Sequence, residues 1–111
     1  MDSILTSIKE SLGITATYDH FDSVIIMHIN TALMILTQIG VGPSEGFVIE
    51  DDSSLWTDFI SDTTKLEAVR SYVSMKVKLM FDPPASGIVV ESMNRNIAEL
   101  EWRLNVNAES S

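Results

Sequence analysis

The sequence has no cysteine among its 111 residues. A disulfide framework, a thiolate zinc site and a cysteine nucleophile are therefore excluded, and stability must come from packing. Cations are also scarce, because seven Lys and Arg stand against 16 Asp and Glu, for a formal net charge of -9. Proteins that grip nucleic acid neutralise its phosphates with many cations, so this balance argues against that class.

Long hydrophobic runs are missing as well. The longest apolar stretch, Val24 to Ile39, is interrupted by polar residues and falls short of the roughly 20 apolar residues that a membrane span needs. The segment from Met1 to Gly13 lacks the charged start and apolar run of a secretion signal. We therefore expect no membrane association and no export.

What is present suits one folded domain, since 45% of the residues are hydrophobic and only 21% are charged. Apolar residues at spacings of three and four predict an all-α fold, a small bundle of four to five helices. Residues 1–104 form the expected domain and residues 105–111 a frayed tail. The expected helices are Ser3–Leu12, Ser23–Ile39, Ser54–Ile60, Thr63–Phe81 and Ser86–Val106.

Caps and breakers place the boundaries of these helices. Asp22 is the expected N-cap of the second helix, and Thr63 or Thr64 that of the fourth. Between the second and third helices, glycines and a proline predict a long, exposed, acidic loop over Gly40–Asp52. Within it, the apolar run Phe47–Ile49 is a candidate for a short extended segment.

The second expected helix is apolar around most of its circumference. Its narrow polar arc also carries Met27 and Met34. An arc this wide predicts a helix at the centre of the core or one covered by another subunit. Core filling and an adaptable contact surface explain the methionines equally well. Trp56 and Trp102 are likewise anchors either of the core or of an interface.

Catalytic and metal-binding patterns are weak throughout. His20 lies between two aspartates in a connecting segment, and His28 lies at the border of a helix face, so both are expected to be structural or surface residues. The acidic run Glu50–Asp52 lacks the ligand alternation and mid-loop glycine of a calcium hand. No phosphate-binding glycine loop occurs. We therefore expect no enzyme, no metal and no cofactor.

Several segments together resemble a known family. These segments are Ser3–Gly13, Thr31–Pro43, Trp56–Ile60, Phe81–Pro84 and Glu91–Arg95. In order along nearly the whole chain, they resemble the head-to-tail connector adaptors of long-tailed phages that infect Gram-positive bacteria.

The resemblance implies a structural virion protein that is assembled in the host cytoplasm. About a dozen copies would close into a ring between the portal and a stopper or tail-completion protein. Phage DNA would pass an acidic channel without specific binding, because acidic walls repel phosphates. Gly40–Asp52 and Asn105–Ser111 would meet neighbouring rings.

Two sets of residues follow as candidates for these roles. The candidate interface residues, for subunits or partners, are Met27, Met34, Phe47, Val48, Ile49, Trp56, Trp102, Asn105 and Val106. The candidate acidic residues, facing the lumen or a partner, are Glu45, Glu50, Asp51, Asp52, Asp58 and Asp62.

A second class of protein also fits the composition. A small acidic phage regulator, such as a DNA mimic that occupies a host protein, would need carboxylates spaced like phosphates along one face. The acids are instead concentrated between Glu45 and Glu67, which makes this the weaker alternative.

Overall fold

The computed structural model describes residues 3–110, apart from the side chains at positions 107, 109 and 110. Over this range the protein has five helices and no strand, which confirms the all-α prediction. No helix in it is long and apolar enough to cross a membrane. The helices are α1 (Ile4–Ser11), α2 (Asp22–Gln38), α3 (Trp56–Phe59), α4 (Thr63–Phe81) and α5 (Gly87–Ser110).

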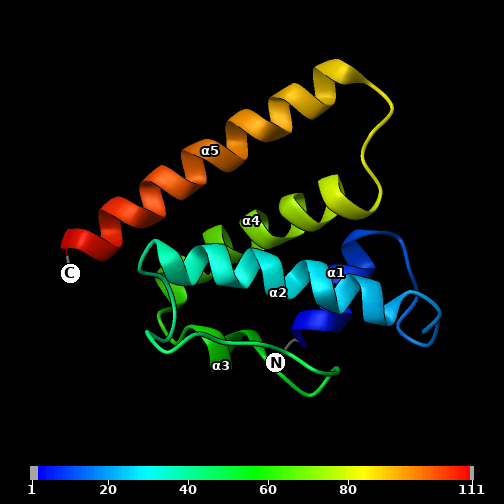
Figure 1. Cartoon of the computed structure of the whole chain (residues 1–111), viewed down its shortest axis with the longest axis horizontal. Coiled ribbons are helices and arrows are strands. Elements are labelled where there is room, and N and C mark those ends of the chain that lie inside the picture. Colours follow the sequence, from blue (N-terminus) through cyan, green and yellow to red (C-terminus); the bar gives the residue numbers. More distant parts are fainter. Residues whose placement is uncertain (1–2, 111) are drawn as a thin grey trace.

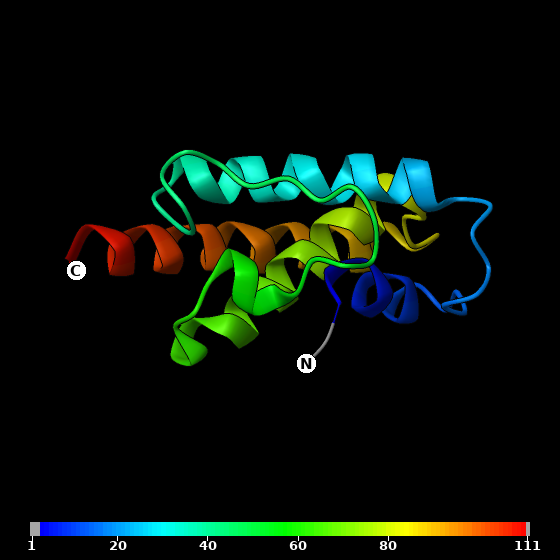
Figure 2. The same ribbon diagram turned by 90° about the horizontal axis from the view of Figure 1, so that it is seen from below.

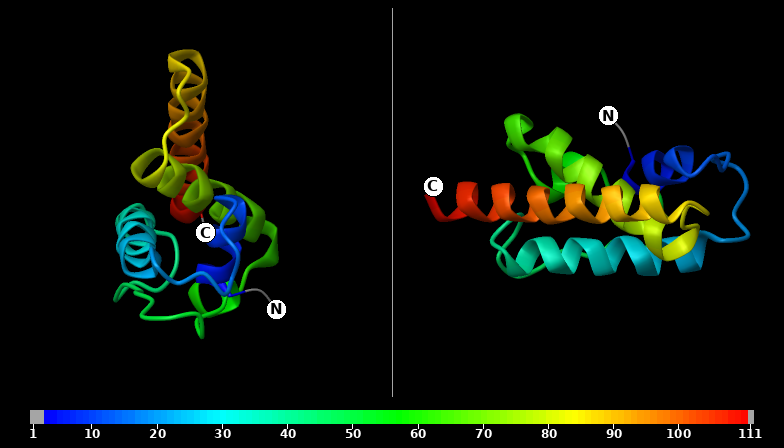
Figure 3. Two further views of the ribbon diagram at one scale, coloured as in Figure 1. Left: turned by 90° about the vertical axis from the view of Figure 1, so that its right-hand side faces the viewer. Right: turned by 90° about the horizontal axis from the view of Figure 1, so that it is seen from above.

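Helices α2 and α4 form the centre of the fold, and α1 packs against both of them. Helix α5 packs against α4 and lies on the side of α4 away from α2 (Figure 1). The long connection between α2 and α3 runs beside α2 (Figure 2). Seen end-on, α5 projects from the other helices (Figure 3), so much of its surface is free of contacts within the chain.

The core is one cluster built from all five helices. It explains the wide apolar arc of α2, because that helix packs between α1, α4 and the connection that follows it. Trp56 and Tyr72 are the largest side chains in the cluster, and each finds a partner for its polar atom. From α2 the core takes Ile25, Ile29, Ala32, Leu33 and Leu36.

Several helix ends differ from the prediction. Asp22 is the first residue of α2 and not its N-cap, because its carboxylate pairs with Lys9 instead. Asp62, and not a threonine, caps α4 by accepting hydrogen bonds from the Thr64 amide and hydroxyl at 2.9 and 2.6 Å. Helix α3 is one turn, Trp56–Phe59, and so is shorter than expected.

The C-terminal segment also differs, since α5 continues to Ser110 where the sequence predicts fraying from residue 105. Asn105 Nδ2 donates to the Ile39 carbonyl at 3.1 Å, and Leu104 is buried, so tertiary contacts support this end. Position 111 lies outside the described residues. One turn before Asn105, Glu101 Oε2 accepts a hydrogen bond of 2.6 Å from the Tyr72 hydroxyl, which joins α4 to α5.

Candidate interaction surfaces

Phe47–Ile49 is held beside α2 by one side chain, with no strand partner among the described residues. Asn30 Oδ1 accepts from the Ile49 amide at 2.8 Å, and Asn30 Nδ2 donates to the Ile49 carbonyl at 3.1 Å. The Asn30 amide thus replaces the neighbouring strand that would otherwise pair with this backbone. It fixes the direction of the segment: Ile49 points into the core, while Val48 points to solvent and is 66% exposed.

Val48 and two methionines of α2 line an apolar groove of about 560 Å³. Met27 and Met34 are 57% and 52% exposed, and they share a helix face because they are seven residues apart. Core filling, one of the two interpretations of these methionines, is therefore wrong. We call this surface the α2 groove; its lining residues are Ser23, Ile26, Met27, Asn30, Thr31, Met34 and Val48.

A second apolar surface lies on α5, on the face that is turned away from α4. Ile88 is 80% exposed and Trp102 is 67% exposed, and Val106 is exposed one turn beyond Trp102. We call Ile88, Arg95 and Trp102 the α5 ridge. Ile88 and Arg95 are not among the interface residues predicted from the sequence, although the seven-residue spacing that links Ile88, Arg95 and Trp102 is readable there.

Other interface candidates lie inside the molecule. Ile49 and Trp56 are each 2% exposed, and the Trp56 indole N–H donates to the Ser7 hydroxyl at 3.1 Å. The half-buried Phe47 packs edge-on against Phe59, with ring centroids 5.5 Å apart. Ile49 and Trp56 are therefore core residues, and this corrects the prediction that they are interface residues. Asn105 is half-buried and attaches α5 to the end of α2.

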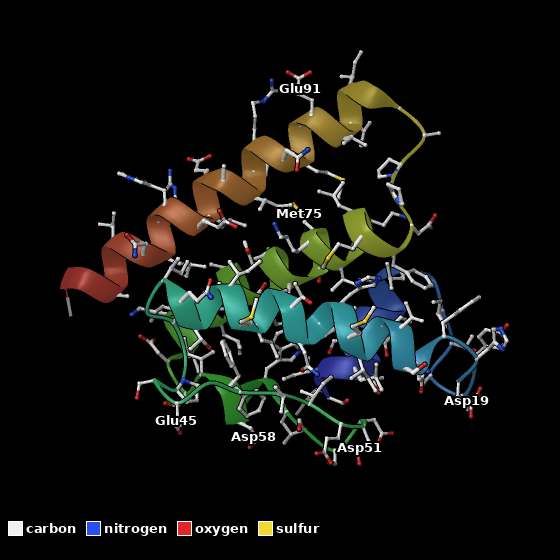
Figure 4. The ribbon with its side chains drawn as sticks, in the orientation of Figure 1. Asp19, Glu45, Asp51, Asp58, Met75 and Glu91 are labelled. Atoms are coloured by element: carbon white, nitrogen blue, oxygen red, sulfur yellow. The ribbon has the colours of Figure 1, made fainter. Side chains whose placement is uncertain are left out.

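All six candidate acidic residues are exposed, and they lie in the connection between α2 and α4. Glu45, Asp51 and Asp58 follow one edge of the molecule, together with Asp19, while Glu91 lies at the opposite edge (Figure 4). The candidate acidic side chains labelled in this view thus lie along one edge of the fold, which we call the acidic edge.

Three of these six acids also accept hydrogen bonds from nearby backbone amides. Asp51 Oδ1 accepts from the Ser53 amide at 2.8 Å and from its hydroxyl, and Asp58 Oδ2 accepts from the Leu55 amide at 2.9 Å. The hydrogen bonds from Ser53 lower the pKa of Asp51, and those from Thr64 lower the pKa of Asp62. Both carboxylates are therefore charged at neutral pH.

Next to the α2 groove lies an acidic hollow of about 510 Å³ that shares Ser23 and Ile26 with it. Its one cation, Lys9, is 2% exposed and is occupied by Asp22 Oδ1 at 2.8 Å and by the Ala16 carbonyl at 3.0 Å. No three His, Cys, Asp or Glu side chains among the described residues converge as metal ligands. The charged residues lining the hollow are Lys9, Asp19, Asp22, Glu50, Asp51 and Asp52.

The two histidines lie apart from both apolar surfaces. His20 is exposed in the connection between α1 and α2, where its ring meets Phe21 edge-on at 4.8 Å between centroids. His28 is half-buried on α2. Neither belongs to a group of three possible metal ligands among residues 3–110.

The chain was also compared with known proteins. No curated protein and no solved structure matched it. A family profile described as "Phage connector protein" matches residues 4–111, nearly the whole chain. That family consists of structural virion proteins that connect head and tail, and not of enzymes. The chain therefore belongs to the phage connector protein family.

Proposed function

We propose that this protein is the adaptor subunit of a head-to-tail connector ring. About a dozen copies surround one axis, with the portal protein on one side and a stopper or tail-completion protein on the other. The observation that carries the proposal is the match to the connector family over residues 4–111. The segregated acidic edge supports the finer description, because a conduit for DNA needs a wall that does not hold phosphates.

In this arrangement the acidic edge faces the lumen. With -9 on each subunit, a ring of about a dozen carries a charge on the order of -100 around its axis. Glu45, Glu50 and Asp52 are exposed acids that cap no helix or turn, so they are free to repel a passing duplex. Phage DNA passes through the ring and is not bound specifically.

The ring is tested by mass photometry and negative-stain microscopy, on the protein alone and after mixing with portal particles. The expected result is a closed oligomer in at least one of the two samples. A strict monomer in both samples contradicts the proposal.

The C-terminal end of α5 is the proposed contact with a neighbouring ring. Deleting residues 105–111 removes Val106, which is 40% exposed, together with the bond from Asn105 to Ile39. We expect the truncated protein to bind portal particles more weakly in co-sedimentation. The variant Asn105→Ala is the matched control, because it removes only the bond to α2. Equal binding by the truncated and full-length chains argues against a portal contact here.

A further inference from the structure

We propose, on the basis of the proposed ring, that neighbouring copies join through the α5 ridge of one subunit and the α2 groove of the next. Both surfaces carry exposed apolar side chains, and they are lined by different residues. A contact between two different surfaces is heterologous, and it can repeat from copy to copy until a ring closes. The proposal therefore names a specific pair of surfaces for the assembly.

The α2 groove is built as a fixed surface. Asn30 uses both atoms of its amide to hold Ile49, and this holds Val48 in solvent beside the exposed methionines. Methionine side chains adapt to the shape of a partner, while the rigid Val48 segment gives the groove a wall. An apolar surface held open in this way costs less to order when a partner binds.

The α5 ridge lies on a projecting helix, as a surface that enters a groove must (Figure 3). Ile88, Arg95 and Trp102 recur every seven residues and so lie on one face of a helix that projects from the body of the molecule. Trp102 is a large side chain with 67% of its surface in solvent. Tryptophan is the residue type that most often anchors a protein interface when it enters a pocket.

Charge selects a second copy of this chain in this orientation. Residues 1–62 contain one cation and ten acids, whereas residues 63–111 contain six cations and six acids. The one cation of the first part, Lys9, is buried, so the acidic hollow beside the groove presents no exposed cation of its own. Pairing two α2 grooves with each other would bring two acidic hollows together, which electrostatic repulsion disfavours.

Pairing groove with ridge avoids that repulsion. Arg95 is 69% exposed on the ridge, where it makes a long, solvent-exposed ion pair with Glu91 at 3.5 Å that a buried partner can replace. Seven residues of helix place Arg95 about 10 Å from Trp102 along the axis. The same spacing separates Met34 from Met27, beyond which Ser23 and Ile26 open into the acidic hollow. With Trp102 seated near Met34, Arg95 lies toward the end of the hollow at Ser23, where Asp19 and Asp22 of the neighbouring copy provide carboxylates, while Glu50 and Asp52 stay available to the lumen.

Cross-linking tests this pairing directly, because the natural chain has no cysteine. The double variant Met34→Cys/Glu99→Cys carries one thiol in the groove and one beside Trp102, so it keeps the tryptophan anchor, and both substitutions are on exposed side chains. With a short thiol-to-thiol cross-linker, we expect a ladder of trimers and larger species on denaturing gels. Each single variant has only one thiol and is expected to stop at the dimer or below.

The matched control is Met34→Cys/Met80→Cys, because Met80 is exposed near the end of α4 and belongs to neither surface. We expect no ladder from it. Closed oligomers that yield no ladder from Met34→Cys/Glu99→Cys overturn the inference and leave the proposed ring intact. Absence of any oligomer, alone or with portal particles, overturns both, so the two failures are distinguishable.

A second measurement does not depend on cross-linking. Trp102→Ala is expected to raise the dissociation constant of self-association by about tenfold or more, while Trp102→Phe retains most of the affinity. Met80→Ala is expected to leave it unchanged. Circular dichroism confirms that each variant is folded. An unchanged dissociation constant in folded Trp102→Ala overturns the inference.

Discussion

Lys9 is the one charged side chain that is fully buried among the described residues of known burial. Its ammonium group lies 2.8 Å from Asp22 Oδ1 and donates to the Ala16 carbonyl, so it ties α1 to the connection and to the first turn of α2. The sequence shows Lys9 among the apolar residues of a helix, but nothing in its spacing names the partner.

Replacing Lys9 by Met leaves the Asp22 carboxylate partly buried without its cation. We expect a loss of about 2–3 kcal/mol in the free energy of unfolding. This is less than the usual cost of breaking a fully buried ion pair, because Asp22 is 28% exposed and water can solvate its carboxylate. Urea denaturation measures this loss. The double variant Lys9→Met/Asp22→Asn is expected to recover part of it. Equal stabilities of the single variant and the natural protein would refute the structural role of the pair.

Tyr72 gives a prediction about pH. Burial first, and then the bond to Glu101, raise the pKa of Tyr72 well above its ordinary value of 10.0. In the unfolded chain this phenol ionises near pH 10 while the folded protein keeps it neutral, so its contribution to stability is present below pH 10 and is lost as pH rises further.

We therefore expect Tyr72→Phe to show a smaller loss of stability between pH 9.5 and 11 than the natural protein does. At pH 7 the same variant is expected to lose about 1 kcal/mol, because Glu101 loses its donor. Denaturation midpoints across this pH range test both parts. Parallel pH profiles for the two proteins would contradict the assignment.

At the scale of elements, Asn30 connects α2 to the long connection that follows it. Replacing it by Ala leaves the amide and carbonyl of Ile49 without their side-chain partner. We expect a loss of about 1–3 kcal/mol in the free energy of unfolding. Amide hydrogen exchange over residues 47–51 should also become faster.

The variant Asn30→Asp is the control for this clamp, because it keeps the acceptor for the Ile49 amide and loses the donor to the Ile49 carbonyl. An intermediate stability is expected. If Asn30→Ala changes neither the stability nor the exchange rates, other contacts hold the segment and the clamp is unimportant.

For the whole molecule, the charge distribution predicts how the ring treats DNA. The natural protein is expected not to retard duplex DNA in a gel at physiological salt. Replacing Glu45, Glu50 and Asp52 by Lys adds two charges at each position and raises the subunit charge from -9 to -3. That variant should retard DNA at low salt and release it as salt rises.

The matched variant carries Gln at positions 45 and 50 and Asn at position 52, which removes the same three acids without adding cations. It should retard DNA less than the Lys variant. These positions are chosen because they cap no helix or turn, whereas Asp51, Asp58 and Asp62 do. Retardation by the natural protein itself would contradict an acidic wall that repels phosphates.

The sequence by itself determined the helical class, the order of the helices and the weakness of any catalytic pattern. These depend on local periodicity, on breakers such as Pro83 and on composition, all of which act over a few residues. The same reasoning gave the exposed acidic connection. It also placed the end of α4 correctly, because a residue before proline disfavours the helical conformation.

Only the tertiary structure decided which apolar residues are core and which are surface. Trp56 and Trp102 both lie in expected helices, yet Trp56 is buried against Ser7 and Trp102 is in solvent. The tertiary structure also decided the role of Asp22. The sequence predicts a helix cap, but Asp22 forms an ion pair with Lys9 because α1 lies beside the start of α2. Burial is set by which elements meet across the fold, and residues far apart in sequence leave no local pattern of that meeting.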